Sequence, residues 1–298
     1  MHSSAALVYL ESAAPEAAPV PARLGGALDR QREKGTTLLA AGDHVLVERR
    51  GDDLVLIERL PRQGCLSRRN PRRREVERVL AAHVDQALVL ASLTRPEIST
   101  RLVDRQIVAA SIQGLTCALG LTKADEAPAG RFDELAAPYR QQGYPVFALA
   151  HDDDESLRRL RTELLAGKTT VLFGPSGVGK STLRNALLPE REPVATGALS
   201  SKWQQGRHVT TAASLERLPE GGYLIDTPGV RGFGLHGVEA GELHHHFPEF
   251  ADATCHFNDC VHQQEPGCGL VDRVERGEAS AERLESLRAM ATSLDEER

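Results

Sequence analysis

The sequence predicts an α/β protein whose central part is a doubly wound, mostly parallel sheet. Between residue 84 and residue 226, short apolar strands alternate with helical segments, which is the order that builds a parallel sheet covered by helices on both faces. Residues 1–82 contain short alternating strands with no long helical period between them, which indicates a separate β-rich domain. The 298 residues are enough for two or three domains with real cores.

The β-rich domain is predicted from two strands and the turn between them. HVLVER (44–49) and DLVLIERL (53–60) alternate apolar and polar residues, and the RRGDD stretch that joins them is typical of a hairpin. A small barrel hides the edges of such strands, and a five-stranded OB-like β-barrel fits the length. The first 20 residues are rich in Ala and Pro, and we expect them to be loosely held.

The central region begins with QALVLASL (86–93), a continuous apolar run that predicts a strand buried on both faces. A helix is expected over 101–114, where Gly114 ends it. The expected elements that follow are strand 115–121, helix 131–142, strand 145–150, helix 155–166, strand 169–173, helix 180–188, an irregular polar stretch, strand 222–226 and, in the tail, a charged helix over 279–295.

A phosphate-binding loop follows strand 169–173. GPSGVGKS matches the pattern G-x4-G-K-[ST] in full, and a strand before it and a helix after it supply the required context. Glycines let consecutive backbone N–H groups surround a phosphate, and the helix N-terminus adds its dipole. Lys180 is expected to contact the β- and γ-phosphates, and the Ser181 hydroxyl to bind Mg²⁺. The predicted loop contacts are Gly174, Pro175, Ser176, Gly177, Val178, Gly179, Lys180, Ser181 and Thr182.

Two further motifs indicate the nucleotide. Asp226 ends an apolar strand and is expected to hold Mg²⁺ through water, while Gly229 offers its amide to the γ-phosphate. The motif TKAD, with Thr122, Lys123 and Asp125, ends strand 115–121, and its Asp is expected to pair with the N1–H and 2-amino group of guanine. TKAD precedes the phosphate loop, whereas in ordinary GTPases it follows. Because ligand loops meet at the carboxyl ends of parallel strands whatever their order, we predict a circularly permuted GTPase domain.

A cluster of metal-ligand residues lies in the tail. Three of the five cysteines fall between 255 and 268, which favours a metal over disulfides. Three thiolates and one imidazole make a closed tetrahedral set suited to structural zinc, with no open position for catalysis. The predicted ligands are Cys255, Cys260, His262 and Cys268. His256 and the run 244–246 are expected to be surface residues, and Cys65 and Cys117 to be small apolar residues.

These features resemble the circularly permuted, ribosome small-subunit-dependent GTPases (ribosome biogenesis GTPase A) from about residue 20 to residue 290. The residues that carry the resemblance are GDHVLV (42–47), HVDQ (83–86), VDR (103–105), TKAD, GPSGVGKSTL, GRHVTTAA (206–213), DTPGVRGFGL (226–235) and the cysteine cluster. The family's domain order implies an OB-like barrel over 1–82, a permuted GTPase domain over 83–240 and a zinc-binding helical module over 241–298.

The sequence departs from the family at three places. The family usually has Asn where Thr122 stands, and a Ser-Ala or Ser-Ser pair where Ala150-His151 stands; the contact expected at Ala150 uses the backbone amide. The family's three threonines correspond to Val209-Thr210-Thr211. Thr210 is the expected switch threonine that joins Mg²⁺, and Thr211 is the alternative.

The expected catalytic residues are His208, Lys180 and Thr210. Many GTPases orient the attacking water with a Gln after the DxxG glycine, but Val230 stands there. The resemblance points instead to His208, because a neutral imidazole can accept a hydrogen bond from the attacking water at physiological pH. The alternative is that His208 is a loop histidine with no chemical role. The missing Gln predicts slow unaided turnover, and the resemblance implies that the 30S ribosomal particle accelerates it.

The partner expected from charge is RNA. The net charge is −6, yet eight arginines stand against two glutamates between Arg59 and Arg78. Such a stretch is either a solvated face or a nucleic-acid contact. OB barrels commonly bind RNA, which favours the nucleic-acid contact. Together with the resemblance, this predicts that the stretch contacts 16S rRNA.

The leading hypothesis is therefore a GTPase that acts late in 30S assembly and leaves on hydrolysis, with GTP/GDP, Mg²⁺ and one structural Zn²⁺ as cofactors. A P-loop ATPase or kinase and a non-catalytic RNA-binding scaffold are the alternatives. No run of 18 apolar residues occurs, and the N-terminus has no basic start before its short apolar patch, so we expect a cytoplasmic protein without membrane spans. We expect it to be a monomer.

Overall fold

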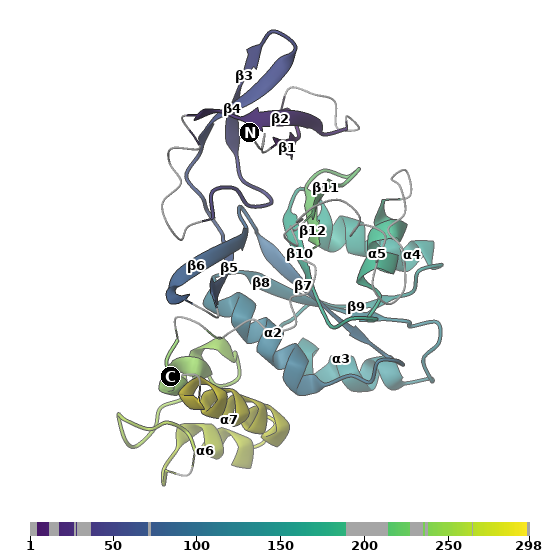
Figure 1. The fold of residues 1–298 in the computed structure, drawn as a ribbon. Coiled ribbons are helices and arrows are strands. Elements are labelled where there is room, and N and C mark those ends of the chain that lie inside the picture. Colours follow the sequence, from purple (N-terminus) through teal and green to yellow (C-terminus); the bar gives the residue numbers. More distant parts are fainter. Residues whose placement is uncertain are drawn as a thin grey trace. The chain divides into compact units, whose positions relative to one another are not determined.

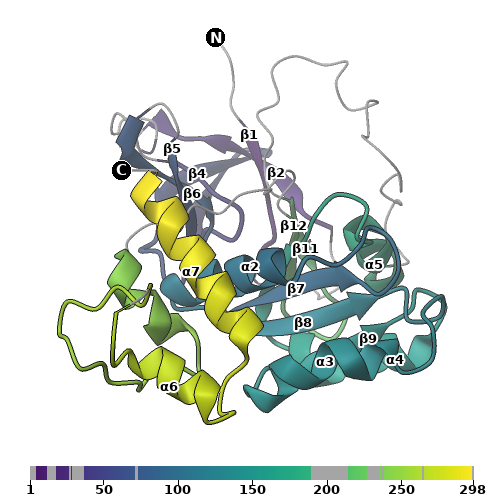
Figure 2. The same ribbon diagram turned by 90° about the horizontal axis from the view of Figure 1, so that it is seen from below.

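The structure is a computed structural model, shown from two sides in Figures 1 and 2. The structure describes residues 5–11, 18–26, 28, 37–70, 73–188, 214–226, 235, 238–263 and 265–296. The chain divides into two compact units. Unit 1 comprises Met1–Gln86, Leu157–Leu172 and Ser181–Gly229, and unit 2 comprises Ala87–Ser156, Phe173–Lys180 and Val230–Arg298.

The N-terminal part of unit 1 is a four-stranded sheet of order β1-β2-β4-β3. Its strands are β1 (Ala5–Val8), β2 (Val20–Leu24), β3 (Val45–Arg50) and β4 (Asp53–Arg59). β3 and β4 form the predicted antiparallel hairpin, which turns at Gly51 with a φ of +64°. Ala22, Leu28 and Leu56 form the buried centre of this sheet.

Two features of this region bear on the sequence predictions. The expectation that the first 20 residues are loosely held is wrong for Ala5–Val8, because β1 pairs antiparallel with β2 along its whole length. A two-stranded antiparallel sheet of β5 (Leu66–Asn70) and β6 (Arg73–Ala81) follows the four-stranded one. These strands are consistent with an OB-like barrel, and the closed barrel itself stays a prediction.

The rest of unit 1 holds the strand that leads into the phosphate loop. β10 (Thr169–Phe173) pairs parallel with β12 (Tyr223–Asp226), and β11 (Ser214–Arg217) pairs antiparallel with β12. β11 lacks a long apolar run, so its sequence did not predict a strand. The helix expected over 155–166 is α4 (Asp154–Leu160) followed by a single π-helical turn, η1 (Arg161–Leu165), and α5 (Lys180–Leu187) is the helix expected over 180–188.

Unit 2 contains the guanine-motif half of the α/β region. Its elements are β7 (Gln86–Ser92), α2 (Thr100–Ile112), β8 (Thr116–Thr122), α3 (Arg131–Gln141) and β9 (Val146–Leu149). Every residue of β7 is buried, as its continuous apolar run predicts, and β8 pairs parallel with β9. The strand order of the six-stranded sheet is β11-β12-β10-β7-β8-β9, which confirms the predicted mostly parallel sheet, with the unpredicted β11 as its antiparallel strand.

The tail of unit 2 is helical. It contains the 3₁₀-helix η3 (Ala240–His246), α6 (Gly269–Glu275) and α7 (Ala281–Glu296), the charged helix expected from the sequence. α7 packs against η3, α6 and α2, as Figure 2 shows for α7 and α2. Within the described ranges, no helix combines the length and the apolar character that crossing a bilayer requires.

Candidate nucleotide and metal sites

The phosphate loop needs its glycines for conformational and steric reasons. Gly174, Gly177 and Gly179 have φ values of +143°, +79° and +106°, which residues with a Cβ rarely adopt. A Cβ on Gly174 would also lie 2.7 Å from the carbonyl oxygen of Leu90. The loop can therefore keep this shape only with glycine at these positions.

Lys180 is held over the loop that it follows. Its Nζ donates hydrogen bonds to the carbonyl oxygens of Gly174 at 2.7 Å and of Pro175 at 2.9 Å. A lysine in this place can reach oxygens of a phosphate that the loop amides surround. The loop therefore has the backbone and the cation that a nucleotide phosphate requires.

The TKAD turn lies against this loop, although it comes before it in the chain. The side chain of Thr122 is buried, and its Oγ1 lies 2.6 Å from the carbonyl oxygen of Val178. Lys123 has a φ of +59° and donates from Nζ to the carbonyl of Arg95. Asp125 is exposed to solvent, which leaves its carboxylate accessible to a ligand.

Ala150 stands at the end of the neighbouring strand. β9 ends at Leu149, whose carbonyl accepts the amide of Ala124 at 3.1 Å. The amide of Ala150 itself points to Ser156 Oγ at a long 3.4 Å. The structure thus brings TKAD, Ala150 and the phosphate loop together in unit 2, as the carboxyl ends of parallel strands would.

Several predicted site residues lie in unit 1 or outside the described residues. Ser181 and Thr182 are the second and third residues of α5, and Asp226 ends β12, all three in unit 1. Asp226 pairs in register with Leu172 of β10. His208, Thr210, the alternative Thr211, Gly229 and Val230 lie outside the described residues, so their roles stay predictions.

The metal cluster has the dimensions of a tetrahedral site. The ligand atoms of Cys255, Cys260, His262 and Cys268 all lie within 4.8 Å of one another. His262 Nδ1 is 3.5 Å from the sulfurs of Cys255 and Cys260 and 3.7 Å from that of Cys268. Zinc bond lengths at a tetrahedral angle put sulfur and nitrogen about 3.5 Å apart. The residues therefore fit zinc.

Contacts behind the ligands hold this arrangement. The amide of Gly269 donates to Cys255 Sγ at 3.3 Å, and a Cβ on Gly269 would lie 2.2 Å from the carbonyl oxygen of Thr254. His262 Nε2 lies 3.2 Å from both the Gly241 carbonyl oxygen and His244 Nδ1, so the other ring nitrogen orients the ligand. Burial lowers the pKa of His262, which favours the neutral imidazole that binds metal.

The expectation that residues 244–246 lie on the surface holds only for His245. His244 is half-buried against His262, and the half-buried His246 has its Nδ1 3.0 Å from Ser111 Oγ on α2. The sequence carried no signal for these contacts, because both partners lie far away along the chain.

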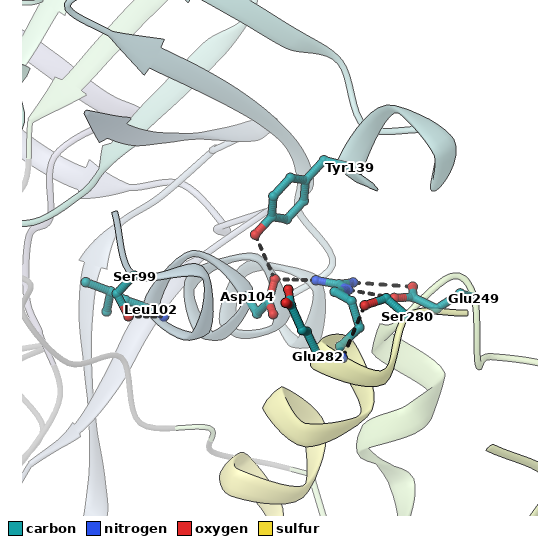
Figure 3. A network of polar contacts seen from close by, with 8 residues as sticks. Ser99, Leu102, Asp104, Tyr139, Glu249, Ser280 and Glu282 are labelled. Atoms are coloured by element: carbon teal, nitrogen blue, oxygen red, sulfur yellow. Dashed lines mark hydrogen bonds and ion pairs between the residues drawn. The ribbon is translucent and has the colours of Figure 1, made fainter. Parts of the chain in front are cut away.

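The tail is also fixed by a buried charge network that sequence reasoning missed. The guanidinium of Arg283 on α7 lies between Asp104 of α2 and Glu249, whose Oε1 is 2.6 Å from Nε. The Tyr139 hydroxyl contacts Asp104 from the other side at 3.1 Å, as Figure 3 shows. The side chains of Arg283, Asp104 and Glu249 are 9%, 2% and 1% exposed. We call these three residues the buried clasp.

A phosphate loop, with a guanine-type turn packed against it but earlier in the chain, defines the class of a circularly permuted P-loop GTPase. Comparison with known proteins agrees: residues 59–236 match the family described as RsgA GTPase. The small ribosomal subunit biogenesis GTPase RsgA of Gemmatimonas aurantiaca is 39% identical over 289 residues, covering 94% of this chain and 90% of that protein. Its namesake from Chlorobaculum parvum is 37% identical over 274 residues, 88% of each chain.

Solved structures lead to the same family. YjeQ from Thermotoga maritima superposes with a TM-score of 0.71 at 30% identity, covering 93% of this chain and 90% of that one. YloQ, described as a circularly permuted GTPase, superposes with a TM-score of 0.72 at 25% identity, covering 100% and 96%. The chain therefore belongs to the RsgA GTPase family, a family of GTP-hydrolysing enzymes, and the predicted circularly permuted α/β GTPase fold is confirmed.

Proposed function

We propose that this chain hydrolyses GTP as a late assembly factor of the small ribosomal subunit, which it leaves after hydrolysis. The observation that carries this proposal is the 2.6 Å contact between Thr122 and the Val178 carbonyl, because it joins a base-reading turn to a phosphate loop. The relatives named as small ribosomal subunit biogenesis GTPases support the ribosomal partner. A P-loop ATPase is disfavoured, since TKAD offers a carboxylate to the donors that guanine has and adenine lacks.

The proposed nucleotide contacts follow from the chemistry of each group. Asp125 accepts from the guanine N1–H and 2-amino group, and the Ala150 amide faces the same base. The backbone N–H groups of residues 176–179 surround the β-phosphate, Gly174 and Pro175 shape the start of the loop, and Lys180 contacts the β- and γ-phosphates. Mg²⁺ would be held by Ser181, with Asp226 and Thr210 completing its surroundings and Thr182 and Gly229 adding contacts to phosphate.

For hydrolysis, we propose that His208 orients the attacking water. Val230 offers no polar group at the position where many GTPases carry Gln. A neutral imidazole nitrogen accepts a hydrogen bond from the attacking water and so directs a lone pair of the water oxygen toward the γ-phosphate. Both residues lie outside the described ranges, so this role rests on sequence and family resemblance.

For the rest of the chain, we propose three domains: an OB-like barrel over 1–82, the GTPase domain over 83–240 and the zinc module over 241–298. Arginines of the Arg59–Arg78 stretch would contact 16S rRNA. Arg62 is an exception, because it forms a largely buried ion pair with Asp43, with Nε 2.7 Å from Oδ1. We propose a cytoplasmic monomer that binds GTP or GDP, Mg²⁺ and one structural Zn²⁺.

The deciding experiment measures GTP turnover with and without purified small ribosomal subunits. We expect slow turnover alone and a large acceleration with the subunits, and ATP should not be hydrolysed. Absence of acceleration would contradict the ribosomal role. The matched variant His208→Ala should bind GDP normally but lose the accelerated turnover; unchanged turnover would remove His208 from the mechanism. The single tryptophan, Trp203, is five residues from His208, so intrinsic fluorescence can follow nucleotide binding without a label.

A further inference from the structure

The side chain of Thr122 has only one hydroxyl proton, and two carbonyl groups compete for it. Oγ1 lies 2.6 Å from the oxygen of Val178 and 3.3 Å from that of Ala91. The shorter distance is the better hydrogen bond, and Thr122 is only 6% exposed. The hydroxyl therefore donates to the phosphate loop.

This hydrogen bond limits what Thr122 can do for the base. The N7–O6 edge of guanine presents two acceptors, so a residue that reads this edge must donate to it. An Asn amide carries two N–H donors and could serve the loop and the base together, whereas a Thr hydroxyl carries one. With its proton committed to Val178, Thr122 has no donor left for guanine.

The same contact reaches the loop between two glycines of positive φ. Val178 stands between Gly177 and Gly179, which both have positive φ, and its side chain is fully buried. The methyl and Cβ of Thr122 also lie 3.7 Å from the place where a Cβ on Gly179 would stand. Thr122 thus contacts the loop by a hydrogen bond two residues before Lys180 and lies beside Gly179.

We propose that Thr122 is a positioning residue for the phosphate loop, and that guanine is selected without it, by Asp125 and the Ala150 amide. This inference rests on the proposed nucleotide site and concerns how that site divides its work. Removing the hydroxyl leaves the Val178 carbonyl without this donor. Loss of a buried hydrogen bond of this kind should weaken the binding of phosphate by the loop roughly 10-fold.

The test compares the affinities of GDP and inorganic tripolyphosphate, both with Mg²⁺, by calorimetry on the full chain. Thr122→Val should weaken both ligands by the same factor, about 10-fold, and Thr122→Ser should restore both. Asp125→Ala is the opposite control, since it should weaken GDP and leave tripolyphosphate unchanged. Zinc content and unfolding of each variant establish that it is folded.

The outcomes separate the two proposals. A Thr122→Val variant that loses GDP affinity alone would overturn the inference, because Thr122 would then read the base, and so would a variant that loses neither ligand. If Thr122→Val does not fold, Thr122→Asn decides: the added amide should tighten GDP and leave tripolyphosphate unchanged, and no gain for GDP counts against the inference. Wild-type protein that binds ADP as tightly as GDP would contradict the proposed function, while the tripolyphosphate arm still decides the role of Thr122.

Discussion

The metal cluster and the nucleotide site are assembled in opposite ways. All four metal ligands come from one segment, 255–268, and already lie at tetrahedral distances from one another. The nucleotide site draws on TKAD, Ala150 and the phosphate loop, and Thr122 meets Val178 across 56 residues of sequence. The first site depends on a local loop, while the second depends on the sheet. Damage to one should therefore leave the other largely intact.

The largest expected effect is loss of zinc. Cys268→Ser removes a ligand from a closed site, and structural zinc contributes about 10 kcal/mol of apparent binding free energy in small modules. We expect bound zinc to fall from one per chain to none and the tail to unfold, with GDP affinity changing less than about 3-fold, a shift below 1 kcal/mol. Elemental analysis and calorimetry measure both quantities.

The matched control is Cys117→Ser, because Cys117 lies outside the cluster and its Sγ is near the carbonyl of Ile107. This variant should keep one zinc. A Cys268→Ser protein that retained zinc, or that lost GDP binding together with it, would show that the two sites are not independent.

The second effect concerns the buried clasp, which anchors the tail to α2. Arg283→Met leaves the carboxylates of Asp104 and Glu249 buried without their cation, and breaking a buried pair in this way costs about 3–5 kcal/mol. The exposed ion pair of Arg276 with Glu278 supplies the control, because Arg276→Met should cost under about 1 kcal/mol. Urea unfolding measures both, and equal losses would contradict the importance of burial.

The third effect falls on the nucleotide site alone. Lys180→Ala removes the ammonium that lies over the phosphate loop, and loss of a charge-assisted contact to phosphate should weaken GDP by roughly 100-fold. Zinc content should stay at one per chain. Nearly unchanged GDP affinity would mean that the loop does not bind phosphate as we describe.

The smallest effect is a pH dependence in the clasp. Burial raises the pKa of Asp104 above its ordinary value, and Arg283 and the hydrogen bonds only partly offset this. Protonation of Asp104 makes its full contribution to the free energy of unfolding below the pKa of about 3.9 in the unfolded state. That contribution is lost as pH rises through the raised pKa of the folded state. Relative to Asp104→Asn, the wild type should therefore lose stability over that window. A wild type that gains stability there would show that attraction to Arg283 dominates.

Short patterns predicted the parts of the molecule that depend on neighbouring residues. The apolar run of β7, the glycines of the phosphate loop and the spacing of the cysteine cluster each carry their structural meaning locally. The buried clasp does not, because Asp104 and Arg283 are 179 residues apart and each reads as an ordinary charged residue on a helix. β1 was missed for the same reason: Ala5–Val8 forms a strand only because β2 supplies its hydrogen bonds.

The measurement that tests the central claim most directly is nucleotide selectivity at Asp125. We claim that TKAD reads guanine although it precedes the phosphate loop. Wild-type protein should bind GDP far more tightly than ADP or xanthosine diphosphate. Asp125→Asn should prefer xanthosine diphosphate, because an amide offers one donor and one acceptor to the C2 carbonyl and N1–H of xanthine. Unchanged preference for GDP in this variant, or equal binding of ADP by the wild type, would contradict the account.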